Sequence, residues 1–189
     1  MRFSYNAPFV LTFSLIAVVI MGISQITGGV STKVFFTIYP KMPYNEPLTY
    51  LRYITYAFGH ANWEHLRNNL TFLLLLGPML EEKYGSKPIL LMSFITVLIT
   101  GILNSVLFNT ALLGASGIVF MFILLASFSN ARSGSIPLTF LLVLFLFLGH
   151  EVINARKVNS ISEFAHIVGG ICGSIFGFWQ SKKLSKSRR

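Results

Sequence analysis

The chain has 189 residues, of which 53% are hydrophobic and 11% are charged. Because soluble domains carry about 25% charged residues, this composition argues against a water-soluble protein and favours one membrane domain over residues 1–189. The net charge of +9 does not indicate nucleic acid as a partner, because the basic residues form no stripe with interleaved aromatic side chains.

Six apolar segments are candidates for membrane-spanning helices, each of which needs about 20 apolar residues. They cover approximately residues 8–28, 64–80, 88–108, 116–129, 136–149 and 163–180. The first is long and lacks an A-x-A-like cleavage site, which favours a span over a signal peptide. Residues 29–58 are too polar to span but rich in Phe, Tyr and Leu, which predicts a long interfacial first loop. We therefore expect an all-α bundle of six transmembrane helices.

The distribution of basic residues predicts the orientation of this bundle. Six spans place both termini on one side, together with nine Lys and Arg residues, five of them in the basic tail 181–189. The other side receives six. Since cytoplasmic segments are richer in Lys and Arg, both termini are expected in the cytoplasm. The single cysteine, Cys172, lies in an apolar run and excludes a disulfide framework.

Polar side chains cluster where the second span begins. His65 and Asn69 are four residues apart and share one helix face. His60, five residues before His65, lies just ahead of the helix or in its first turn. They are either interfacial residues at the start of a helix or functional groups facing the bundle interior. A zinc site is disfavoured, because the H-E-x-x-H pattern is absent. No metal and no cofactor are expected.

A serine and a histidine stand in two later spans. Gly114-Ala115-Ser116-Gly117 places Ser116 at the start of the fourth span, where backbone N–H groups lack helical partners and can bind an oxyanion. His166 lies three residues before Gly169 in the sixth span, and Gly173 and Gly177 follow at intervals of four. Glycines at this spacing form a smooth face that another helix can approach closely. Tight packing alone would also explain them.

The chain contains no aspartate, so a Ser-His-Asp triad is impossible. Glu163 lies three residues before His166 and could orient it, but a buried carboxylate is costly in this position. We favour a dyad of Ser116 and His166, with the imidazole held by packing on an aromatic ring such as Phe120, one helical turn after Ser116.

Together these residues resemble the rhomboid family of intramembrane serine proteases, from about Arg52 to Gly177. The family pattern His-x4-His-x3-Asn matches His60, His65 and Asn69, and Gly-x-Ser-Gly matches residues 114–117. The Ala-His with its glycine series matches residues 165–173. The resemblance implies a water-filled cavity open to the non-cytoplasmic side.

The resemblance also implies roles for individual residues. Ser116 would be the nucleophile and His166 its base, with the oxyanion bound by the Ser116 N–H, His65 and Asn69. The supporting residues would be His60, Gly114, Gly117, Phe120, Gly169 and Gly173. Glu81, in Glu-x3-Gly, and Arg52 would be structural. The family's Trp-Arg pair is Leu51-Arg52 here, and Phe120 replaces a common Tyr. His150 and Glu151 match no role.

The expected substrates are single-span membrane proteins, cut where the helix is locally unwound, because an intact helix hides its peptide bonds in hydrogen bonds. Membrane lipid is the other expected partner, and the small chain suits a bacterial plasma membrane. Two alternatives remain open: a catalytically inactive relative that binds membrane helices, and a small transporter. No internal repeat or paired carboxylates favour the transporter.

Overall fold

The computed structural model describes residues 4–128, 135–148 and 161–186. Within these ranges the helices are joined by turns and loops, and one isolated β-bridge is present. The elements in chain order are α1 (Pro8–Ile26), α2 (Val30–Phe35), α3 (Pro47–Thr55), the 3-10 turn η1 (Tyr56–Phe58), α4 (Trp63–Tyr84), α5 (Ser86–Leu107), α6 (Ser116–Ser127), α7 (Leu138–Val143), the π-helical turn η2 (Leu144–Leu148) and α9 (Ile161–Lys186).

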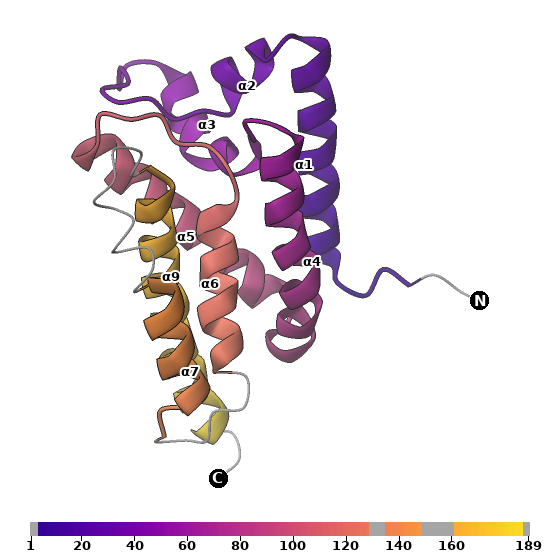
Figure 1. Cartoon of the computed structure of the whole chain (residues 1–189), viewed down its shortest axis with the longest axis vertical. Helices are drawn as coiled ribbons and strands as arrows, with labels where there is room; N and C mark the ends of the chain where they lie inside the picture. The colour runs from indigo at the N-terminus through magenta and orange to yellow at the C-terminus, as the bar shows by residue number, and fades with distance from the viewer. Residues whose placement is uncertain (1–3, 129–134, 149–160, 187–189) are drawn as a thin grey trace.

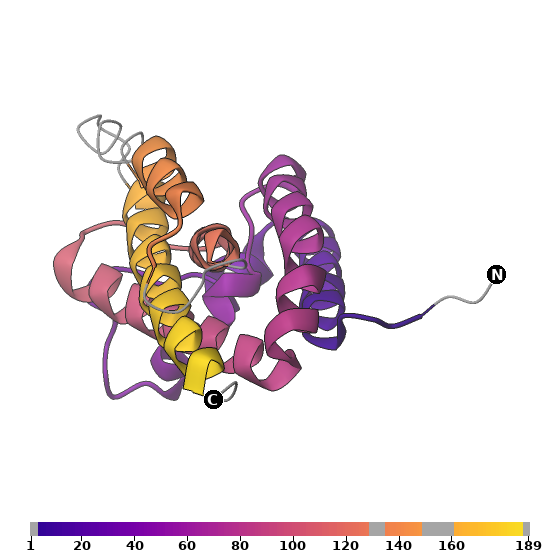
Figure 2. The same ribbon diagram turned by 90° about the horizontal axis from the view of Figure 1, so that it is seen from below.

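Helix α6 is the centre of the bundle. It lies between α4 with α1 on one side and α9 with α5 on the other, and the view along its axis shows the same arrangement (Figures 1 and 2). Ten consecutive residues, 116–125, are buried, so this helix has no polar face. A helix that is apolar all round is suited to the middle of a bundle, where every side contacts protein.

Each of the six predicted segments contains a helix, but three of them differ from the prediction by more than two residues. The sixth helix, α9, continues to Lys186, past the predicted end at residue 180 and into the segment predicted as a basic tail. The second helix does not end at Leu80; it continues through Glu81 to Tyr84 and ends at Gly85, whose φ is +88°. The fifth is a short α-helix followed by a π-helical turn. The predicted first loop contains α2, α3 and η1, since Pro47 at the first turn of α3 favours helix there.

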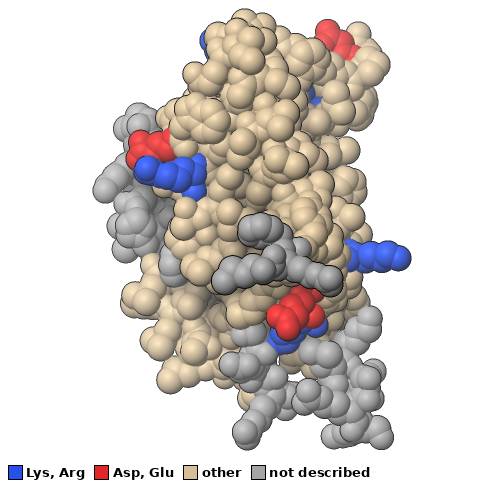
Figure 3. Space-filling view, turned by 90° about the vertical axis from the view of Figure 1, so that its right-hand side faces the viewer, with Lys and Arg blue, Asp and Glu red and all other residues tan. Residues whose placement is uncertain are grey.

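Large apolar side chains are exposed on every long helix, among them Leu15, Leu75, Leu91 and Ile175. One face of the molecule shows charged residues only as isolated spots on a predominantly uncharged surface (Figure 3). Among the described helices, Pro8–Ile26 and Ser86–Leu107 have the length and composition of a membrane span. Soluble monomers rarely expose apolar surface on this scale. The number of six spans stays a prediction.

Glu81 explains why α4 continues past its predicted end. The N-cap residue of α1, Ala7, offers no side-chain acceptor, so the first N–H groups of that helix need another partner. The N–H groups of Phe9 and Val10 donate to the two carboxylate oxygens of Glu81, at 2.8 and 3.1 Å. Glu81 is 4% exposed. A negative charge at a helix N-terminus is favourable, so this carboxylate joins α1 to α4.

Arg52 fixes the segment between α1 and α4. Its Nε donates to the carbonyl oxygen of Val34 at 2.7 Å, and its guanidinium lies over the ring of Tyr39, 5.6 Å from the centroid. These contacts tie α3 to α2 and to the chain between them. Leu51, where the family often has tryptophan, is exposed.

Candidate active site

Ser116 is the first residue of α6, and the loop before it is held by backbone hydrogen bonds. Ile38 and Leu112 pair as an antiparallel bridge with two N–H···O distances of 2.9 Å, and the N–H of Gly114 donates to the carbonyl oxygen of Tyr56 at 2.9 Å. Ser116 is 9% exposed. Because the helix begins here, the Ser116 N–H has no helical partner four residues earlier.

His166 comes from α9 and packs against the helix of the serine. Its imidazole is stacked on the phenyl ring of Phe120, with centroids 4.1 Å apart and planes within 9°. Phe120 is four residues after Ser116, so the two lie on one face of α6. The imidazole is therefore held over the face that carries the serine, by the ring contact that the sequence suggested.

The glycines of α9 bring the two backbones together. A Cβ added to Gly169 would collide with the carbonyl oxygen of Gly117, and one added to Gly173 would collide with that of Met121. On the facing side, a Cβ at Gly117 would lie 3.5 Å from the carbonyl oxygen of Ala165. Ala165 and Gly117 are the chain neighbours of His166 and Ser116. The close approach of α6 and α9 thus occurs beside both residues.

His65 and Asn69, near the start of α4, reach the loop that precedes the serine. Gly114 has φ +115°, and a Cβ there would lie 2.7 Å from Cε1 and 2.9 Å from Nε2 of His65, and 3.7 Å from Nδ2 of Asn69. Glycine therefore suits position 114 both by its positive φ and because a Cβ there would displace the His65 ring, while Asn69 lies at ordinary contact distance. His65 is also close enough to interact electrostatically with His166.

Asn69 has an unused donor. The residue is 6% exposed, and its Nδ2 forms no hydrogen bond with any group that the structure describes. A buried donor without a partner costs about 1–3 kcal/mol, so such groups call for an explanation. This donor lies beside Gly114, two residues before Ser116 in the chain, where an acceptor bound in the site could satisfy it.

His60 lies just before α4 and supports His65. The two rings meet edge to face with centroids 5.0 Å apart, and Nδ1 of His60 lies 3.1 Å from the carbonyl oxygen of Phe58. Burial, reinforced by the neighbouring His65, lowers the pKa of His60 to about 4. It therefore stays neutral at physiological pH and acts here as a packing group.

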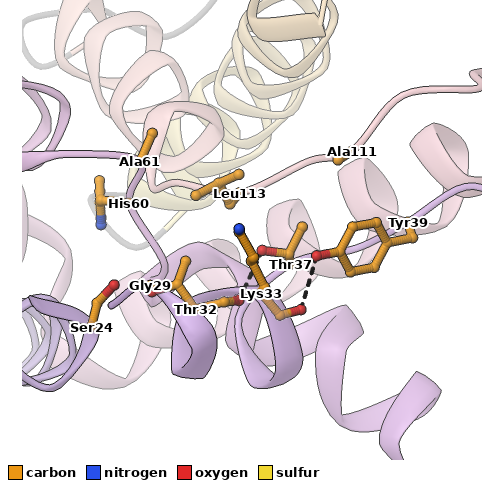
Figure 4. A pocket seen from close by; sticks show the side chains of 10 residues that line it. All are labelled: Ser24, Gly29, Thr32, Lys33, Thr37, Tyr39, His60, Ala61, Ala111 and Leu113. Atoms are coloured by element: carbon orange, nitrogen blue, oxygen red, sulfur yellow. Dashed lines mark hydrogen bonds between the residues drawn. The ribbon is translucent and has the colours of Figure 1, made fainter. Parts of the chain in front are cut away.

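A cavity of about 330 Å³ with mixed polar and apolar lining lies beside His60 (Figure 4). Lys33 and Thr37 line it from the first loop, and Ala111 and Leu113 line it from the segment before the serine. In Figure 4 the Lys33 ammonium group points across the cavity, while the Thr37 hydroxyl donates to the carbonyl oxygen of Thr32 at 2.9 Å. The cavity adjoins the site without containing Ser116 or His166.

Sequence reasoning missed Tyr56. Its carbonyl oxygen accepts from Gly114, and its buried hydroxyl donates to the carbonyl oxygen of Val97 at 3.0 Å, so it links the serine loop to α5. Nothing in the local pattern distinguishes it from other interfacial tyrosines. The side chain of Glu163 and the predicted polar residues His150 and Glu151 lie outside the described part of the chain.

Comparison with known proteins shows the family of this chain. The Rhomboid domain family model matches residues 47–183. This chain belongs to the rhomboid family. It is 28% identical to Rhomboid protease GlpG of Haemophilus influenzae over 134 residues, 69% of this chain and 70% of that one. It is 25% identical to Rhomboid protease GlpG of Yersinia pestis (strain Pestoides F) over 201 residues, 98% and 70% of the two chains. Membership of the rhomboid family and the apolar helices identify a membrane protein.

Proposed function

We propose that this member of the rhomboid family is an intramembrane serine endopeptidase in which Ser116 and His166 form a two-residue catalytic dyad. The observation that carries the proposal is the stacking of His166 on Phe120, one turn after Ser116, beside the backbone contact of Gly117 with Gly169. The printed names of the relatives, which describe proteases, support the reaction class.

In this mechanism the Ser116 hydroxyl attacks the scissile carbonyl carbon while His166 takes its proton. His166 then returns the proton to the leaving amine, and the peptide C–N bond breaks to give an acyl-enzyme. Water attacks the ester, His166 accepts a proton from it, and the proton returns to Ser116 as the acid product leaves. Since the chain contains no aspartate, ring stacking on Phe120 takes the orienting role that a carboxylate has in a triad.

The oxyanion of each tetrahedral intermediate would be bound by the Ser116 N–H and by the side chains of His65 and Asn69. The unpartnered Nδ2 of Asn69 supports this assignment, because the negative oxygen would supply the missing acceptor. One such donor contributes about 2.7–4 kcal/mol to the barrier. No metal or cofactor enters any step.

We further propose that the substrates are single-span membrane proteins with a locally unwound segment near the non-cytoplasmic surface, since only unwound chain exposes its peptide bonds. The excess of Lys and Arg on the side of the termini supports cytoplasmic termini and a site that opens to the opposite side of a bacterial plasma membrane. His65 and Asn69 would then lie near the non-cytoplasmic end of α4.

Labelling with a serine-directed fluorophosphonate tests the dyad. The wild-type protein in detergent should be labelled and should cleave a fluorescent membrane-helix substrate, and both signals should be lost in Ser116→Ala and in His166→Ala. Ser127→Ala, at the other end of α6, is the matched control and should retain both. Labelling that persists in Ser116→Ala would refute the nucleophile. A wild-type protein that binds the substrate without labelling or cleavage would indicate the inactive relative.

A further inference from the structure

A mostly apolar groove of about 530 Å³ lies between α5 and α9, at the end of these helices remote from Ser116. Leu91 and Ile95 line it from α5, and Ile175 and Phe176 line it from α9. Helix α9 reaches its C-terminal end here, at the bottom of Figure 1. The groove shares no residue with the candidate active site.

Two polar side chains stand in this apolar groove. Lys87, in the first turn of α5, is exposed and forms no ion pair with a carboxylate that the structure describes. Gln180 of α9 is 7% exposed, and it lines the same groove. The groove therefore combines apolar walls with a cation and a side-chain amide.

The apolar walls alone would not select a ligand in a membrane, because lipid tails are as apolar as the leucine and isoleucine side chains that they meet. Selectivity has to come from the polar groups. A phosphate would accept from the Lys87 ammonium group and from the Gln180 amide, whereas a choline or ethanolamine cation beside that phosphate would be repelled by Lys87.

We propose that this groove binds one anionic phospholipid, with an acyl chain between α5 and α9 and the headgroup phosphate at Lys87 and Gln180. Each basic residue near a membrane surface favours anionic lipid by about 1 kcal/mol, which corresponds to a preference of about fivefold. The basic tail 181–189 follows the groove directly in sequence and adds positive charge to this end of the chain. The proposal requires a bilayer setting but not proteolytic activity.

Tryptophan fluorescence can report lipid bound in this groove. It has two tryptophans, of which Trp179 lines the groove and Trp63 begins α4. In the full-length Trp63→Phe variant, quenching by phospholipids with brominated acyl chains reports lipid at Trp179. In phosphatidylcholine vesicles, brominated phosphatidylglycerol should reach half-maximal quenching at about one-fifth of the mole fraction that brominated phosphatidylcholine needs. Trp179→Phe, which leaves Trp63, should show no such preference.

Two substitutions in the Trp63→Phe background decide whether the groove is a site. Lys87→Gln removes the cation and Gln180→Leu removes the amide, and each should bring the two lipids close to equal quenching. Lys33→Gln, which removes a lysine of the first loop, is the control and should keep the preference. Equal quenching by both lipids in the parent would overturn the proposal. A preference lost in Lys87→Gln but kept in Gln180→Leu would also overturn it, because that result indicates diffuse attraction to surface charge.

Discussion

The imidazole of His166 lies parallel to the phenyl ring of Phe120, with the ring centroids 4.1 Å apart. The two residues come from different helices, and Phe120 belongs to the helix that Ser116 begins. The orientation of the proposed base is therefore set by an apolar contact with the same helix that presents the proposed nucleophile.

Replacing the ring should slow catalysis. An aromatic pair contributes about 0.5–1.5 kcal/mol beyond burial, so Phe120→Leu should lower kcat about two- to tenfold with little change in KM. Phe120→Tyr keeps the ring and should remain close to wild type. Steady-state cleavage of a membrane-helix substrate measures both, and a wild-type kcat in Phe120→Leu would show that the stacking does not orient His166.

Asn69→Ala should separate activity from stability. Loss of an oxyanion donor lowers kcat about 10²–10³-fold. Because Nδ2 of Asn69 has no partner among the described groups, its removal should leave the thermal unfolding temperature nearly unchanged. The neighbouring Asn68 is exposed, and Asn68→Ala is the control for both measurements. A large fall in unfolding temperature with proportionate loss of activity would indicate a structural role instead.

Gly169→Ala should impair activity by separating α6 from α9, since the added Cβ would collide with the carbonyl oxygen of Gly117. Gly22→Ala is the matched control: it also places alanine within a long helix, but nothing lies within 4 Å of the new Cβ. Alanine favours helix over glycine by about 1 kcal/mol, so this control should be neutral or slightly stabilising. Comparable activity in the two variants would exclude the glycine contact as the determinant of the Ser–His approach.

Glu81→Gln should destabilise the bundle without touching the site. The substitution removes the charge from two hydrogen bonds at the start of α1 and leaves one acceptor oxygen, at a cost of about 1–3 kcal/mol. Glu82→Gln changes an exposed carboxylate at the next position and should have little effect. Thermal unfolding in detergent compares the stability of the two variants. Equal stability would argue against stabilisation of the α1 N-terminus by the Glu81 carboxylate.

His60 should make folding sensitive to acid. Its pKa is about 4 in the folded protein and about 6.5 ordinarily, so between these values the unfolded chain binds the proton more readily. Stability should fall as the pH drops from 6.5 towards 4, by about 3 kcal/mol at most, and His60 contributes no pH dependence above 6.5. His60→Gln cannot titrate, so its unfolding temperature should fall less than that of wild type over this range. If the unfolding temperatures of wild type and His60→Gln fell in parallel with pH, the lowered pKa of His60 would be contradicted.

The helices of the core were predictable because each is a long apolar segment, whereas their ends depend on tertiary contacts. The run Glu81-Glu82-Lys83 has the polarity of a loop. It is helical because the Glu81 carboxylate accepts hydrogen bonds from the first turn of α1, which is far away in the sequence. The short helices α2 and α3 lie in a segment too polar to be predicted as a membrane span, and its pattern did not reveal them as helices.

Motif spacing selected Ser116, His166, His65 and Asn69 from the sequence, and packing logic suggested Phe120. The geometry of the serine loop could not be read in this way. Tyr56 and the Ile38–Leu112 bridge act through backbone groups, which every residue possesses, so side-chain identity gives no signal of them.

The Ile38–Leu112 bridge also determines how far this protein can be shortened. Ile38 precedes the segment 47–183 that matches the family model, yet both of its backbone hydrogen bonds go to the loop before Ser116. A fragment trimmed to the matched segment would lack α1, the partner of Glu81, and the chain that pairs with Leu112. The recognisable domain is therefore smaller than the unit that folds, and expression of a minimal version should start at the first helix.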